Sequence, residues 1–224
     1  LRLLGYFERS QLRLLPLVKM ALDPGLHATL EQVLRDLWSE LSRGAVDRHH
    51  GFHVPTLCTI AADGAPSARS VVLRRVEPEP GELWCHTDWR SAKVAEIRRA
   101  PRVAWHFYAP ERKLQLRVGA DAEFEATGPR ADEGWSRSAL SSRRAYLAPR
   151  APGSACDGPS PNLPAGILDR RPTEDETVPA RANFGVIVTR VAAIDWLSLA
   201  SEGHRRARFV RAVDGSWSGR WVEP

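Results

Sequence analysis

The chain has 224 residues, of which 43% are hydrophobic and 26% charged, a composition typical of an ordinary folded protein with one sizeable core. Its net charge of +5, from 32 basic and 27 acidic residues spread along the chain, is too small to indicate a nucleic-acid-binding protein. No apolar run approaches the roughly 20 residues that cross a bilayer, so we expect neither a membrane nor a nucleic acid as partner.

The cysteines and histidines bear on the redox compartment and on metal binding. The cysteines are Cys58, Cys85 and Cys156. They form no Cys-x-x-Cys pair and their number is odd, which indicates buried thiols in a reducing compartment, so we expect a cytoplasmic protein. His49, His50 and His53 have no companion Cys/His cluster, and no metal site is predicted.

The first part of the chain is predicted to be an N-terminal extension, residues 1–25, before a single domain at residues 26–224. Residues 1–19 are rich in leucine and arginine, but they contain Glu8 and lack the continuous apolar core of a targeting segment. Met20 is the only methionine and precedes a natural start of the domain. Our hypothesis is that residues 1–19 are a peripheral extension or lie before the true start of the protein.

The first half of the domain is predicted to contain a helix followed by β-hairpins. Apolar residues recur on one helical face from residue 26 to residue 43, and Gly44 follows as a stop. From residue 54 the apolar period changes to two, and Asp63-Gly64 is a typical hairpin turn. The elements predicted here are a helix at 26–43, strands at 56–61, 68–76 and 82–87, and a helix at 91–99.

The second half is predicted to be mostly strands. Residues 113–125 alternate most clearly between apolar and polar side chains. Residues 148–182 hold many of the 17 prolines and are predicted to form a mobile loop. The other predicted elements are strands at 102–108, 184–193, 194–199, 206–213 and 217–222, and a helix at 131–147. Because hairpins dominate and βαβ repeats are missing, we expect a six- to seven-stranded antiparallel barrel, mainly β with flanking helices.

Two stretches a dozen residues apart predict a phosphate site. Arg69 and Arg74 bound a strand in which arginine and apolar residues alternate, and the polar turn that follows ends in Ser91 and Lys93 at the start of a helix. Cations on a strand edge that face hydroxyl groups and a lysine at a helix start can hold a phosphorylated cofactor. Alternatively, the arginines are exposed strand residues and Ser91 is a plain helix cap, although one serine can cap a helix and contact phosphate at once.

Four sequence pieces in order resemble the pyridoxamine 5'-phosphate oxidase-like flavoproteins, which have the FMN-binding split-barrel fold. These pieces are Arg69–Arg74, His86–Lys93, Gln115–Gly119, and Trp196 with His204–Phe209 and Trp217–Pro224. The match runs from about residue 26 to residue 224 and is poor at 148–182. The resemblance implies an antiparallel split β-barrel and FMN as the cofactor.

By this resemblance, Arg69 and Lys93 pair with the FMN phosphate, and Thr87 and Ser91 add hydroxyl hydrogen bonds. An arginine can clamp a phosphate with two parallel bonds, whereas a lysine acts as a point charge. The full implied set of cofactor-binding residues is Arg69, Ser70, Val71, Val72, Leu73, Arg74, His86, Thr87, Ser91, Lys93, Gln115, Trp196 and Arg208.

The resemblance also implies a symmetric homodimer with the flavin site at the subunit interface. Gln115 would reach the polar edge of the flavin ring, and Trp196 and Arg208 would come from the second subunit. On its own, however, a tryptophan such as Trp196 is more often a core residue than a cofactor wall.

The substrate half of the site departs from the family pattern. The family's Arg-x-His-x-Arg run is His204–Arg208 here, so the first arginine and the histidine are replaced, and the arginine that precedes the phosphate lysine is Ala92. The family's tyrosine and arginine near residue 135 become Trp135 and either Arg137 or Ser138. The implied substrate-binding residues are Arg74, Trp135, Ser142, His204 and Arg206.

These features predict an FMN-dependent oxidoreductase that oxidises or reduces a small-molecule substrate by hydride transfer via flavin N5. Because losing one charged hydrogen bond to a substrate phosphate costs about 1.5–3 kcal/mol, we expect a substrate other than pyridoxamine 5'-phosphate. His204 and Arg206 fit a proton donor and an anion clamp, and they equally fit solvated surface residues. No catalytic residue is assigned. The alternative is a non-catalytic FMN-binding carrier or sensor.

Overall fold

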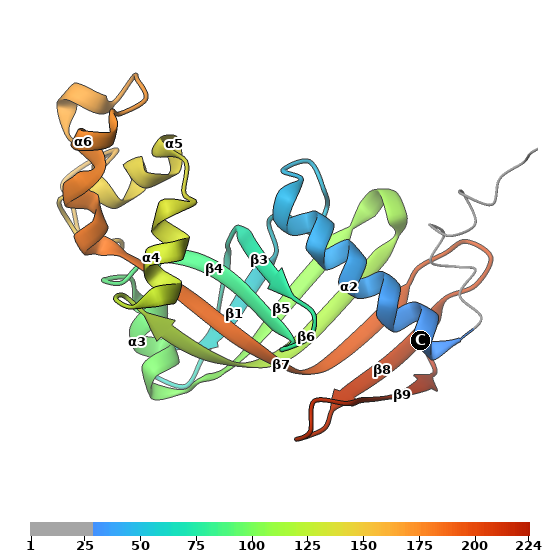
Figure 1. The fold of residues 1–224 in the computed structure, drawn as a ribbon. Helices are drawn as coiled ribbons and strands as arrows, with labels where there is room; N and C mark the ends of the chain where they lie inside the picture. Colours follow the sequence, from blue (N-terminus) through green and yellow to red (C-terminus); the bar gives the residue numbers. More distant parts are fainter. Residues whose placement is uncertain (1–28) are drawn as a thin grey trace, which may run out of the picture.

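A computed structural model describes residues 29–224, which form one nine-stranded antiparallel sheet that curves around a central core (Figure 1). The hydrogen-bonded order is β2-β1-β5-β6-β7-β4-β3, and β8 and β9 continue from β7. The strands are β1 Thr56–Ile60, β2 Pro66–Ser70, β3 Leu73–Glu77, β4 Glu82–Asp88, β5 Arg102–Ala109, β6 Leu114–Glu125, β7 Phe184–Ser198, β8 Arg205–Arg211 and β9 Trp217–Val222. The predicted fold class is confirmed, with nine strands rather than six or seven.

Helices cover parts of the sheet and extend one end of it (Figure 1). The α-helices are α2 Leu30–Val46, α3 Ala92–Arg99, α4 Pro129–Ser136, α5 Leu140–Arg143 and α6 Glu174–Thr177, and the 3-10 helices are η2 Pro110–Arg112, η3 Arg144–Leu147, η4 Ala165–Ile167 and η5 Val178–Asn183. The predicted extension at residues 1–25 lies outside the described residues. No helix in the described range is long and apolar enough to cross a membrane.

Helix α2 begins where a capping box satisfies its first backbone groups. The Thr29 hydroxyl accepts from the Gln32 backbone N–H at 3.2 Å, and the Gln32 side chain accepts from the Thr29 N–H at 3.1 Å. Its apolar stripe is buried against the sheet through Val33, Leu37 and Leu41. The predicted helix is therefore present, and within the described residues it starts at Leu30. The predicted stop at Gly44 is wrong, because the helix continues through Gly44 to Val46 and is capped by Asp47.

The single strand predicted at 68–76 is wrong, because the chain there forms two strands. Strand β2 pairs with β1, whereas β3 pairs with β4 on the other side of the sheet. Between them, the Val71 N–H donates to the Pro55 carbonyl at 3.0 Å and the Leu73 N–H donates to the His53 carbonyl at 2.9 Å. The side-chain alternation continues through this crossing, so the sequence pattern hides it. The crossing places Arg69 and Arg74 on different strands.

Three other predicted elements differ in the structure. The helix predicted at 131–147 is divided into α4, α5 and η3. The strands predicted at 184–193 and 194–199 are one strand, β7, with a bulge at Ala192 that leaves the pairing with β6 intact on both sides. The segment 148–182 contains η4, α6 and most of η5; its predicted mobility stays a prediction. Of the three thiols predicted to be buried, Cys85 is buried, whereas Cys156 is exposed.

The core of the barrel is aromatic and is crossed by a polar relay. Trp105 on β5 is 1% exposed and packs with its ring nearly parallel to that of Phe107, at 5.9 Å between centroids. Its indole N–H donates to the Thr189 hydroxyl at 3.1 Å, and Thr189 donates to the Leu83 carbonyl at 2.9 Å. This relay joins β5, β7 and β4 through the interior, and it satisfies every polar group that it buries.

Candidate functional site: a phosphate cradle and a charged cleft

The predicted phosphate residues come together where β4 ends and α3 begins. The Lys93 ammonium donates to the Thr87 hydroxyl at 3.1 Å and to the Ser91 hydroxyl at 3.0 Å. Ser91 is the residue before α3, yet its side chain makes no helix-capping hydrogen bond and instead donates to the Asp88 carbonyl at 2.7 Å. We call Thr87, Ser91 and Lys93 the cradle. Both hydroxyls accept from Lys93, and both donate to the Asp88 carbonyl, Thr87 at 3.1 Å. The cradle thus gathers two hydroxyls and one ammonium at a single point, and the ammonium supplies the positive charge that a phosphate requires.

Arg69 lies near the cradle but is already partnered. Its guanidinium donates to Glu96 at 2.9 Å, to the Ser67 hydroxyl at 2.6 Å, and to Thr59. Burial lowers the pKa of Lys93, and the charge of Arg69 contributes to this lowering. The Arg69–Glu96 pair holds the guanidinium in place and cancels much of its charge, so Lys93 is the main source of positive charge at the cradle.

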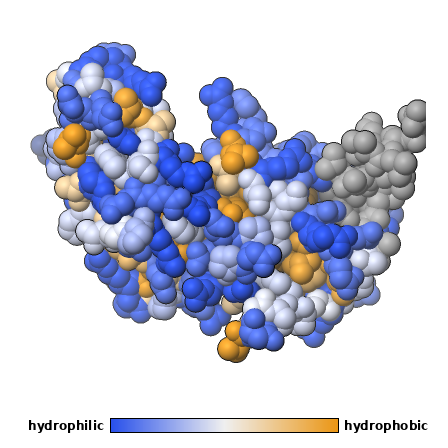
Figure 2. All heavy atoms as spheres, viewed as in Figure 1, coloured by the Kyte–Doolittle hydropathy of each residue, from blue (hydrophilic) through white to orange (hydrophobic). Residues whose placement is uncertain are grey.

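A cleft of about 560 Å³ opens between the C-terminal end of α2, strands β3 and β4, and helix α4. In Figure 2 the molecule is hollowed between the α4–α6 region and α2, and the surface there is mostly hydrophilic. The cleft is lined by Ser42, Ala45, Val46, Arg74, Arg75, Val76, Glu77, Trp84, His86, Glu133, Gly134, Arg137 and Ser138. Arg74 and His86 therefore lie together, as the sequence predicts, and Ser138 rather than Trp135 faces them.

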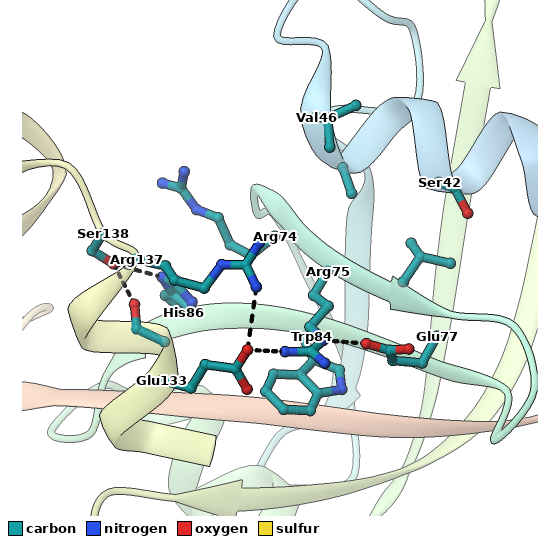
Figure 3. A pocket seen from close by; sticks show the side chains of 13 residues that line it. Ser42, Val46, Arg74, Arg75, Glu77, Trp84, His86, Glu133, Arg137 and Ser138 are labelled. Atoms are coloured by element: carbon teal, nitrogen blue, oxygen red, sulfur yellow. Dashed lines mark hydrogen bonds and ion pairs between the residues drawn. The ribbon is translucent and has the colours of Figure 1, made fainter. Parts of the chain in front are cut away.

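An ion-pair network lies along one wall of the cleft (Figure 3). Arg75 donates to both Glu77 and Glu133, and its guanidinium carbon lies 4.8 Å from the centroid of the Trp84 ring. Arg137 donates to the same Glu133 oxygen at 3.2 Å, and these hydrogen bonds lower the pKa of Glu133. Sequence reasoning missed Arg75 and Glu133, although the Glu133 to Arg137 spacing of four residues is a recognisable helical ion pair.

His86 forms the inner end of the cleft as a neutral ring. Its Nδ1 lies 3.3 Å from the Ser138 hydroxyl, and its ring meets Phe184 edge to face at 4.9 Å between centroids. Burial lowers the pKa of His86 to about 4, with a further contribution from Arg74, so it carries no charge at neutral pH. Gly134 allows this packing, because a Cβ there would lie 2.9 Å from a Val186 methyl group and 3.1 Å from His86 Nε2.

The predicted residues on the C-terminal strands form a separate group. Arg206 and Arg208 both donate to Asp195, Arg206 through two bonds at 2.9 and 2.8 Å. Arg117 on β6 donates to the same carboxylate at 2.7 Å. Three guanidinium groups thus share one aspartate on the face formed by β6, β7 and β8, which leaves this face rich in positive charge. His204 precedes β8 and is exposed.

The remaining predicted residues have other neighbours within the protomer. Trp196 is 1% exposed and packs edge to face with Trp221, so its ring is a core residue of its own subunit. Gln115 contacts His106 at 3.2 Å. Trp135 packs on Phe184 and does not line the cleft, and Ser142 lies in α5. Among the other predicted cofactor residues, Val71 and Leu73 are buried, Val72 is half-buried, and Ser70 is exposed at the end of β2. Contacts between these residues and a flavin stay predictions.

Comparisons with known proteins agree with this fold. The family model described as "Pyridoxamine 5'-phosphate oxidase, FMN-binding domain" matches residues 35–125, which include β1 to β6 and the whole cradle. A pyridoxine/pyridoxamine 5'-phosphate oxidase of Jannaschia sp. is 31% identical over 178 residues, which cover 75% of this chain and 82% of the relative. The corresponding oxidase 2 of Arabidopsis thaliana is 30% identical over 131 residues, which cover 54% of this chain and 65% of that relative.

A solved structure confirms the architecture. The chain aligns with a pyridoxamine 5'-phosphate oxidase-related, FMN-binding protein of Nostoc punctiforme at a TM-score of 0.69 and 20% identity, over 85% of this chain and 97% of the other. Fold and matched domain together define an FMN-binding split-barrel protein, which confirms the predicted fold and the predicted cofactor. The chain belongs to the pyridoxine/pyridoxamine 5'-phosphate oxidase family.

Proposed function

We propose that the protein is an FMN-dependent oxidoreductase that holds the FMN phosphate in the cradle and a small substrate in the adjoining cleft. The observation that carries this proposal is the convergence of the Lys93 ammonium on the Thr87 and Ser91 hydroxyls beside Arg69. These groups meet in a chain whose matched domain binds FMN. A phosphate there exchanges water for an ammonium and two hydroxyls that are already in position, which lowers the cost of ordering them.

In this proposal the chain's own residues bind and orient the cofactor and the substrate. FMN, when bound, supplies the capacity to accept and release a hydride at flavin N5. Lys93 neutralises part of the phosphate charge, and the Ser91 and Thr87 hydroxyls orient the phosphate group. Trp84 and Val46 give the cleft an apolar surface, and Arg74 presents a cation to the substrate. Because His86 is neutral, it can exchange hydrogen bonds with a substrate without adding charge.

The proposal includes a symmetric homodimer in the cytoplasm. The charged face around Asp195 would complete the flavin site of the second subunit through Arg208 and bring His204 and Arg206 to its substrate. The surplus of guanidinium groups on this face supports that role, because three arginines share one carboxylate.

The second candidate function is a non-catalytic FMN-binding carrier or sensor. The observation that favours it is the bidentate bond between Arg206 and Asp195, which occupies the guanidinium predicted to hold the substrate. In such a protein the FMN phosphate binds at the cradle, but no substrate in the cleft is oxidised or reduced.

Purified protein tests the proposal through its chromophore and its turnover. We expect a yellow preparation from which FMN is extracted at about one per chain, and flavin reduction by at least one small substrate under anaerobic conditions. Pyridoxine 5'-phosphate and pyridoxamine 5'-phosphate are the first substrates to measure, with hydrogen peroxide as the readout under oxygen. A protein that takes up no FMN when incubated with it contradicts the proposal. FMN binding without reduction by any member of a substrate panel favours the carrier or sensor.

A further inference from the structure

The charges that line the cleft almost cancel. Arg75, Arg137, Glu77 and Glu133 form one connected network in which Glu133 accepts from both arginines and Glu77 accepts from Arg75. Two positive and two negative groups leave this network neutral as a unit. A ligand in the cleft therefore meets a wall of paired charges rather than a cluster of free cations.

Among the described residues that line the cleft, Arg74 is the one charged side chain outside this network. Within residues 29–224 it has no hydrogen bond or ion pair, and its side chain is exposed. In Figure 3 it extends into open space from β3, whereas Arg75 and Arg137 turn toward Glu133. One guanidinium is thus available to a ligand, with His86 and Ser138 as neutral neighbours.

A cleft with one available guanidinium distinguishes between anions of different charge. A carboxylate carries one negative charge and two oxygens in a plane, which a single guanidinium can pair with two parallel hydrogen bonds. A phosphate ester near neutral pH carries about two negative charges. Its second charge has no free cation among the described residues that line this cleft, because Arg75 and Arg137 are already paired with Glu77 and Glu133. The partial exposure of these residues weakens this disadvantage, but it does not change its sign.

We propose that the cleft is selective for a small planar molecule with a single carboxylate, held by Arg74, rather than for a phosphate ester. The inference rests on the proposed function only in taking this cleft as the substrate site. Trp84 and Val46 supply the apolar contact for the body of such a molecule, and Ser138 supplies a hydroxyl at the inner end.

A matched pair of probes tests the selectivity. Benzoate and phenyl phosphate share one aromatic ring and differ in the charge of the head group. We expect benzoate to bind the FMN-saturated protein at least about three-fold more tightly at neutral pH, as measured by ligand-observed NMR titration. Arg74→Gln is expected to weaken benzoate binding about ten-fold or more, the loss of one charged hydrogen-bonding partner. Arg102→Gln is the control, because it changes an exposed arginine on β5 that is paired with Asp121 on β6, and it should leave benzoate binding unchanged.

A second variant tests the source of the selectivity. Glu133→Gln removes one negative charge from the network, and it should raise the affinity for phenyl phosphate more than that for benzoate. The proposal is overturned if the unaltered protein binds phenyl phosphate as tightly as benzoate or more tightly. It is also overturned if the protein binds neither probe. Two separate measurements distinguish this inference from the proposed function. Failure of the protein to bind FMN refutes the proposed function. The preference between benzoate and phenyl phosphate, titrated also on protein without flavin, decides this inference.

Discussion

Replacing Lys93 by methionine is expected to weaken FMN binding by about ten- to 100-fold. The substitution keeps the length of the side chain and removes the ammonium that lies between Thr87 and Ser91. A hydrogen bond to a charged group contributes about 1.5–3 kcal/mol, and each 1.4 kcal/mol is about a factor of ten in affinity. Flavin fluorescence titration measures the change. Riboflavin has the same ring and no phosphate, so its affinity should stay within about two-fold.

The second described lysine supplies the matched control. Lys113 is exposed and lies just before β6, and Lys113→Met should leave the affinities for FMN and riboflavin unchanged. If Lys93→Met lowers the affinities for FMN and riboflavin equally, the ammonium acts through the fold and not through the phosphate, and the cradle is wrongly assigned.

Replacing Trp105 by alanine is expected to lower the free energy of unfolding by about 3–5 kcal/mol. The side chain is almost completely buried in the core, where it reaches from β5 to Thr189 on β7, and its removal leaves a cavity that packed neighbours fill only in part. It also removes the donor to Thr189. Urea denaturation followed by tryptophan fluorescence or circular dichroism measures the loss.

Two further variants separate packing from the hydrogen bond. Trp105→Phe keeps most of the apolar contact, and Thr189 still donates to the Leu83 carbonyl, so a smaller loss is expected. Tyr108→Ala on the same strand is the surface control, because Tyr108 is 44% exposed, and it should cost less than about 1 kcal/mol. A Trp105→Ala protein no less stable than Tyr108→Ala would show that the relay is not part of the packed interior.

The parts of the structure that follow from sequence are those set by neighbouring residues. Strand β6 is predictable because one alternating pattern runs from residue 114 to residue 125 and one face is buried. The cradle is predictable for the same reason, since Thr87, Ser91 and Lys93 are separated by few residues at a strand-to-helix junction. Local geometry alone brings these three side chains together.

The parts that sequence did not predict depend on contacts between distant residues. Glu96 pairs with Arg69 across 27 positions, and Arg75 pairs with Glu133 across 58, and no local pattern indicates either pair. The crossing between β2 and β3 is hidden because the alternation continues through it. The phase of α4 decides that Gly134, and Ser138 two residues after the helix ends, face the cleft while Trp135 packs on Phe184. An error of one residue in that phase exchanges a cleft residue for a core residue.

A crystal structure of the protein with FMN is the most direct test of the cradle. We expect the phosphate oxygens within hydrogen-bond distance of Lys93 Nζ and of the Thr87 and Ser91 hydroxyls, with the Arg69 guanidinium beside them. A phosphate bound elsewhere, with the Lys93 ammonium still closed on Thr87 and Ser91, would contradict the account.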